Sequence, residues 1–155
     1  MLREELIEDE AETSEGTWNH IRDAIQTKVP FVIITFKTKE SCNAAIKTDL
    51  REYNVTRQLN ILYRNNDKLK YPSVFFVLNK DFDFKERVKD LFEKYDVRMI
   101  IIGVQNGDSS TVYFEDGSSS NYGNEVVNVL DQAEFQNEDH FKVGSMHYQF
   151  VEFKK

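Results

Sequence analysis

A carboxylate and an ammonium group near the end of the sequence have the spacing of a nuclease motif. Glu152 and Lys154 are separated by one residue. In metal-dependent nucleases such a glutamate binds a divalent ion, and the lysine stabilises charge on the phosphate. Mg²⁺ needs more oxygen ligands than one glutamate supplies, and the nearest acidic candidates are Glu138 and Asp139. Because a Glu-x-Lys triplet often arises by chance, a divalent-metal nuclease ranks third among our hypotheses, and we expect these carboxylates not to converge.

The histidines and the single cysteine form no recognisable catalytic or metal-binding pattern. His20, His140 and His147 lie in three separate segments without the i, i+4 spacing of a zinc site. Cys42 falls on the apolar stripe of a predicted helix and is interpreted as a core residue. With one cysteine the chain forms no internal disulfide, which fits a reducing compartment. The glycines form no phosphate-binding loop. We therefore predict no enzymatic activity, no metal and no cofactor.

A basic segment and a tryptophan are the candidates for binding a partner. The basic candidates flank a predicted strand and the loop after it: Arg57, Arg64, Lys68 and Lys70. Such an edge suits phosphate groups, although a run of this kind is more often a solvated strand end. Trp18 is either an exposed anchor for a partner or, because it lies at helical spacing from Ile21 and Ile25, a core residue.

The net charge of −7 is distributed unevenly along the sequence. Residues 1–27 carry 2 basic and 8 acidic side chains, residues 28–102 carry 15 and 10, and residues 103–155 carry 3 and 9. The acidic ends keep the protein soluble, cover the basic middle, or meet a basic partner. Residues 1–15 are predicted to form an acidic mobile arm, and residues 16–155 a single α/β domain.

The length and composition are those of one ordinary globular domain. The chain has 155 residues, of which 40% are hydrophobic, and 12 Phe and 7 Tyr make extensive disorder improbable. The longest apolar runs, 30–36 and 99–104, are far shorter than the ~20 residues of a membrane-spanning helix. We expect a cytoplasmic protein.

The hydrophobic period alternates between that of helices and that of strands. Helices are predicted from about residue 17, over 38–53 and over 83–95, and strands over 29–36, 57–64, 71–78, 98–104, 111–114 and 146–153. The segment 115–123 is predicted to be a loop, and 125–130 a short helix or a strand. The three core strands at 31–36, 73–78 and 99–104 lack clean alternation, so both faces of their sheet should be covered.

The order of these elements predicts an α+β fold. Its centre is a ferredoxin-like β-α-β-β-α-β core, with an N-terminal helix and an added C-terminal hairpin and strand. Right-handed crossovers would place both core helices on one face of the sheet. RNA-recognition modules share this order, but YPSVFFVL at 71–78 lacks their basic-Gly-aromatic pattern.

The segment 16–117 resembles a family of uncharacterised proteins. The likeness lies in GTWNHIRDAI followed by PFVIITF, in Asn43 near the start of a helix, and in PSVFFVLN and FKERVKDLFEKYDVRMIIIG. These segments are similar to those of a domain of unknown function found in short bacterial and tailed-phage proteins. The resemblance implies a phage source, hence the host cytoplasm, and a role in modifying host processes. It assigns no site residues.

Three functional hypotheses follow, from three classes of protein. The first is a non-enzymatic interaction protein, a phage-encoded regulator or inhibitor that binds a host or virion protein. The second is a nucleic-acid-binding module that uses the basic 57–70 region. The third is the divalent-metal nuclease.

Overall fold

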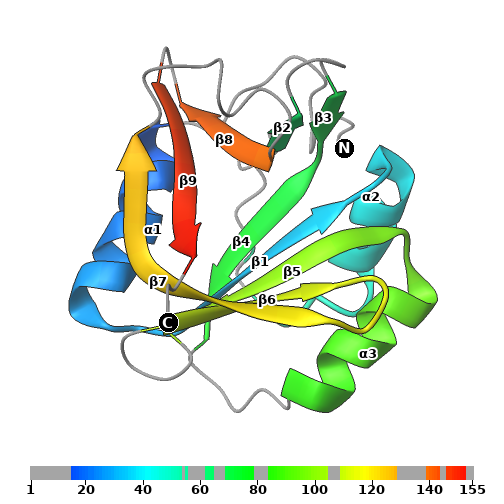
Figure 1. Ribbon diagram of the computed structural model, residues 1–155. Coiled ribbons are helices and arrows are strands. Elements are labelled where there is room, and N and C mark those ends of the chain that lie inside the picture. The colour runs from blue at the N-terminus through cyan, green and yellow to red at the C-terminus, as the bar shows by residue number, and fades with distance from the viewer. Residues whose placement is uncertain are drawn as a thin grey trace.

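The computed structural model describes residues 15–53, 55, 62–64, 69–78, 84–104, 109–128, 139–143 and 146–152. In these ranges the chain forms three helices and nine strands (Figure 1). Their order is α1 (Glu15–Thr27), β1 (Phe31–Phe36), α2 (Lys39–Lys47), β2 (Leu62–Arg64), β3 (Leu69–Tyr71), β4 (Ser73–Val77), α3 (Phe84–Lys94), β5 (Val97–Gly103), β6 (Ser109–Phe114), β7 (Ser119–Asn128), β8 (Asp139–Val143) and β9 (Met146–Glu152). The predicted arm lies outside the described residues, apart from Glu15, which begins α1.

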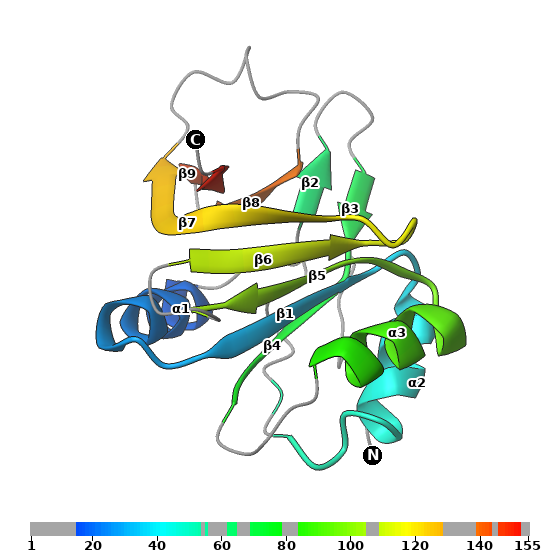
Figure 2. The same ribbon diagram turned by 60° about the horizontal axis from the view of Figure 1, so that its bottom comes forward.

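The described strands belong to one sheet, in the order β3-β2-β8-β9-β7-β6-β5-β1-β4, and its pairs are antiparallel. Its two outermost strands, β3 and β4, are separated in the chain only by Pro72. The sheet must therefore curl until its ends approach each other, as Figures 1 and 2 show. Pro72 cannot donate to a ladder, but its carbonyl accepts a 2.8 Å hydrogen bond from Phe36 N.

Two hydrophobic clusters cover the two faces of the central strands. On one face α2 and α3 pack over Val32, Ile34 and Phe36 of β1, and on the other α1 packs over Phe31 and Ile33. Figure 2 shows α1 on one side of the central strands and α2 and α3 on the other. All six residues of β1 are buried. Coverage of both faces explains the missing alternation and confirms that prediction.

The helices on the first face are held by a cap, by apolar contacts and by polar links between them. Thr38 caps α2 by accepting a 3.1 Å hydrogen bond from Ser41 N. Cys42 is fully buried in the cluster, as predicted, and the Tyr53 ring stacks on Phe76 with centroids 4.4 Å apart. The Tyr95 hydroxyl lies 2.6 Å from Thr48 Oγ1. The second helix ends at Lys47 rather than near 53, and the chain then turns so that the predicted stripe still reaches the core.

The α+β class is confirmed, and the ferredoxin-like core stays a prediction. The order β5-β1-β4 and the placement of α2 and α3 on one face agree with that topology. However, β2 pairs with β3 and β8 in the described residues rather than with β4. Pro72 divides the predicted strand at 71–78, so that Lys70 belongs to β3 instead of a loop.

The C-terminal part contains more strand than the sequence predicted. The hairpin of β5 and β6 is confirmed. The predicted loop at 115–123 is wrong beyond Ser118, because β7 begins at Ser119 and pairs with β6. Of the two possibilities for 125–130, the strand is correct as far as Asn128, and β8 was not predicted. The last strand, β9, lies where it was expected.

Candidate functional site

The tight turn between β6 and β7 is the centre of the candidate site. Gly117 adopts a φ of 91°, a conformation that glycine takes without a steric penalty. Asp116 Oδ1 accepts hydrogen bonds from Ser118 N at 2.9 Å and from the Ser118 hydroxyl at 2.6 Å. Phe114 N donates to Ser118 O at 2.9 Å and closes the turn. The sequence Asp-Gly-Ser thus fixes the direction of the Asp116 carboxylate.

The two carboxylates at the turn differ in their surroundings: Asp116 has a lowered pKa, and Glu115 forms an ion pair with Lys37. The hydrogen bond from the Ser118 hydroxyl, followed by that from its amide, lowers the pKa of the exposed Asp116 carboxyl. Glu115 Oε1 lies 2.6 Å from Lys37 Nζ, and 62% of the Glu115 side chain is exposed. An exposed pair of this kind contributes little to stability. Its effect is to orient Glu115 beside the sheet.

An irregularity in β5 brings an arginine to the face that α1 covers. Thr35 pairs with Met99 but Phe36 pairs with Val97, so Arg98 is an extra residue in β5, a β-bulge. A bulge changes the direction of a side chain that would otherwise alternate. The Arg98 guanidinium stacks 4.5 Å from the centroid of Tyr71, which packs against the cluster under α1. Arg98 and Met99 consequently project on the same side.

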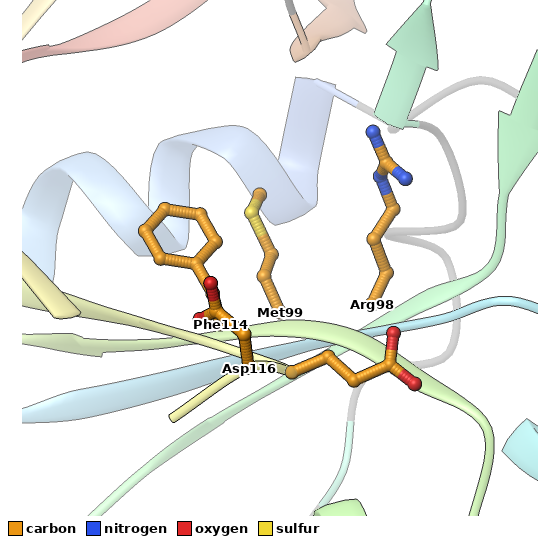
Figure 3. Close-up of a pocket in the computed structure, with 5 residues that line it drawn as sticks. Arg98, Met99, Phe114 and Asp116 are labelled. Atoms are coloured by element: carbon orange, nitrogen blue, oxygen red, sulfur yellow. The ribbon is translucent and has the colours of Figure 1, made fainter. Parts of the chain in front are cut away.

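These features enclose a hollow of about 440 Å³, lined by Arg98, Met99, Phe114, Glu115 and Asp116. Met99 and Phe114 are cross-strand partners in β5 and β6 and form the apolar part of its wall. Figure 3 shows the Met99 thioether between the Phe114 ring and the Arg98 side chain, with α1 behind them. A cation and two carboxylates therefore flank an apolar floor, a composition typical of binding sites for polar ligands and for protein partners.

A second hollow, of about 340 Å³, lies on the opposite side of the same turn, against α3. Its lining comes from α3, from the end of β6 and from the turn: Val88, Lys89, Phe92, Glu93, Tyr113, Phe114, Glu115, Gly117 and Ser118. Phe114 and Glu115 line both hollows. The turn therefore contributes residues to both hollows.

The structure brings two of the sequence-predicted basic residues to one hairpin. Arg64 is the last residue of β2 and Lys70 the middle residue of β3, where it pairs with Tyr63. Arg64 is also opposite Asp139 of β8, so an acidic residue pairs with one of the two basic positions. Arg57 and Lys68 lie outside the described residues. Trp18 lies on α1, and the choice between anchor and core residue stays a prediction.

The residues of the nuclease hypothesis lie on neighbouring strands. Asp139 begins β8 and Glu152 ends β9, opposite Tyr122, whereas Glu138 and Lys154 lie outside the described residues. Within the part of the chain that the structure describes, no three His, Cys, Asp or Glu side chains gather as a metal site. The expectation that the carboxylates of Asp139 and Glu152 do not converge stays a prediction.

Sequence reasoning missed the five residues of the first hollow. Two weak signals pointed to them. Arg98 is the one charged residue in the apolar strand 97–103, and Asp116-Gly117 is a common turn dipeptide. Neither signal reveals that β5 contains a bulge, because the bulge is defined by pairing with β1.

The fold and the site define an α+β protein with two hollows that share the residues of a hairpin turn. No protein-family model matches the chain, and no curated protein or solved structure gives a significant match. None of the helices in the described ranges has both the length and the apolar character needed to cross a membrane.

Proposed function

We propose that the protein is a non-enzymatic interaction protein, a phage-encoded regulator or inhibitor that binds a host or virion protein through the hollow at Arg98. The ferredoxin-like core belongs to the same proposal and is supported by the order β5-β1-β4 with α2 and α3 on one face. The observation that carries the proposal is the apolar floor between opposite charges.

The chemistry of the hollow defines the surface of the partner. An apolar side chain of the partner enters against Met99 and Phe114, an acidic group faces Arg98, and a basic group faces Asp116. Arginine and aromatic residues with a desolvated apolar centre contribute most of the affinity in protein interfaces. The exposed Asp116 carboxyl, whose pKa is lowered by the hydrogen bonds from Ser118, is anionic at neutral pH like any exposed aspartate and attracts a basic group.

The proposal is tested with charge reversals of the same size in two places. Asp116→Lys alters the rim of the hollow, and Asp90→Lys makes the same change on an exposed position of α3 that lines neither hollow. Proteins captured from a bacterial host lysate are identified, purified and titrated calorimetrically against the wild type and both variants. We expect a stoichiometric partner whose affinity falls at least about tenfold, or 1.4 kcal/mol, with Asp116→Lys and less than about twofold with Asp90→Lys.

Two results would overturn this proposal. One is that every purified candidate binds the wild type and both variants with equal affinity. The other is that no purified candidate binds at micromolar concentration.

The nucleic-acid hypothesis is favoured by one observation, the placement of Arg64 and Lys70 on a single hairpin. It is tested by fluorescence anisotropy with a labelled random single-stranded oligonucleotide at two salt concentrations. Binding through phosphates must weaken steeply as salt rises, and an Arg64→Gln, Lys70→Gln double variant must weaken it further. A dissociation constant below about 1 µM at physiological salt would favour nucleic-acid binding over the protein-binding proposal, because non-specific contacts are usually weaker.

A further inference from the structure

The hollow between α3 and the β6–β7 turn has aromatic walls. Phe92 and Tyr113 are half-buried and pack against the cluster that α2 and α3 cover. Val88, 7% exposed, lies at the base. Figure 1 shows α3 lying beside the end of the β6–β7 hairpin, and residues of both elements line the hollow. Two rings and an aliphatic residue thus form an apolar chamber that is accessible from solvent.

The charges near the mouth of this chamber are of both signs. Glu93 is exposed on α3, and Glu115 is exposed on the turn. Lys89 also lines the hollow, and Lys37 lies 2.6 Å from Glu115. The space beside Gly117 is open, since a Cβ built there would meet no atom within 4 Å. Because Glu115 already pairs with Lys37, we assign the attraction for a cation to Glu93.

Aromatic faces and carboxylates are complementary to the same kind of group. The negative face of an aromatic ring attracts an ammonium or a guanidinium ion. Lysine and arginine have an aliphatic stem that packs on apolar surface, and a charged head that stays near water. A chamber with an apolar base, two aromatic walls and the Glu93 carboxylate at its mouth accommodates both parts of such a side chain.

We propose that this second hollow binds a lysine or arginine side chain of a protein partner. The stem lies against Val88 and Phe92, and the charged head lies over Tyr113, facing Glu93. The inference rests on the proposed function only in that a partner supplies the side chain. It adds the chemistry that the partner must present: a basic residue on the α3 side of the turn, in addition to the apolar anchor at Met99.

The test uses a small probe and needs no partner. Nα-acetyl-lysine N-methylamide is titrated into the ¹⁵N-labelled full chain, with Nα-acetyl-norleucine N-methylamide as its uncharged counterpart. We expect amide shifts confined to 88–93 and 113–118, with a dissociation constant in the millimolar range for so small an interaction. The norleucine compound should shift the same amides by less than half as much at equal concentration.

Matched variants on α3 test whether the Glu93 carboxylate recognises the charge of the lysine probe. Glu93→Gln removes one carboxylate at the mouth, and Asp90→Asn makes the same kind of change at an exposed position outside the hollow. Affinity for the lysine probe should fall about two- to fivefold with Glu93→Gln, the range of an exposed ion pair. It should be unchanged with Asp90→Asn.

The results separate this inference from the proposed function. Absence of shifts at 88–93 and 113–118, equal shifts with norleucine, or equal affinity after Glu93→Gln would each overturn it, even where Asp116→Lys abolishes binding of a partner. Conversely, selective binding of the lysine probe supports it even where no partner binds at the hollow next to Arg98.

Discussion

Gly103→Ala introduces a methyl group into a position that the ring of Phe31 already occupies. Gly103 and Phe31 are cross-strand partners in β5 and β1. A Cβ built on Gly103 would overlap the Cζ, Cε1 and Cε2 atoms of Phe31. The ring is fully buried and packs at 52° against Phe75, with centroids 5.7 Å apart. It therefore has no free space into which it can move.

The expected effect is the difference between two opposing contributions. Alanine in a strand is favoured over glycine by about 0.5–1 kcal/mol, because glycine loses more backbone freedom on folding. Overpacking of a filled core costs about 1–3 kcal/mol. Because three ring atoms are displaced rather than one, we take the upper part of that range. The net prediction is a loss of about 2 kcal/mol in the free energy of unfolding, measured by urea denaturation followed by circular dichroism.

A double-mutant cycle assigns the loss to the ring. In a Phe31→Leu background the added methyl group has room, so Gly103→Ala should be neutral or stabilising, with a coupling energy of about 1–3 kcal/mol. Gly117→Ala is the control, since its strain arises from a φ of 91° without any close contact, and Phe31→Leu should not rescue it. A loss below about 0.5 kcal/mol in the wild type, or an equal loss in both backgrounds, would refute the reasoning.

Three further predictions concern the core, the turn and the nuclease hypothesis. Leu91→Ala should cost about 2–5 kcal/mol in urea denaturation, because Leu91 is 3% exposed; a loss below about 1 kcal/mol would contradict the packing of α3. Ser118→Ala should raise the pKa of Asp116 toward 3.8 in a carboxyl NMR titration, and Ser119→Ala should not. Since the folded-state pKa of Asp116 is lowered, the associated stability is present above the ordinary pKa and is lost as pH falls through the folded value. In Mg²⁺ or Mn²⁺ the protein should not nick plasmid DNA, and nicking that Glu152→Ala abolishes would overturn the non-enzyme proposal.

The core could be predicted from the sequence because buried apolar residues recur at the spacing of a helix or of a strand. The stripe of Cys42, Ile46 and Leu50 was recognised although α2 ends at Lys47, since the chain that follows continues to turn toward the sheet. The apolar strands at 31–36 and 98–104 were expected in one sheet, and they pair there as β1 and β5. In each case several residues of one type repeat at a spacing that only one local structure satisfies.

The pairing of the remaining strands was not predictable, because it depends on distant partners. The first residues of β7 are Ser119 and Ser120, which carry little strand preference and resemble a loop. They form a strand because they pair with Tyr113 and Val112 of β6. The short β2 likewise pairs with β8, more than seventy residues later in the chain, and no local pattern encodes that choice.

The same distinction explains why the candidate site was missed although the two strands that form its floor were predicted. Met99 and Phe114 belong to strands that the sequence predicted, and the ladder between β5 and β6 alone brings them together. The charged groups reach the hollow through two local departures from regular structure, a bulge that redirects Arg98 and a turn that directs Asp116. Bulges and turns of this kind are common where a protein must direct a side chain toward a ligand. The apolar part of the site is thus a consequence of folding. The charged part is defined by one extra residue in β5 and by the Asp-Gly-Ser turn. If the proposed function is correct, substitutions in the bulge and in the turn should change which partner is bound.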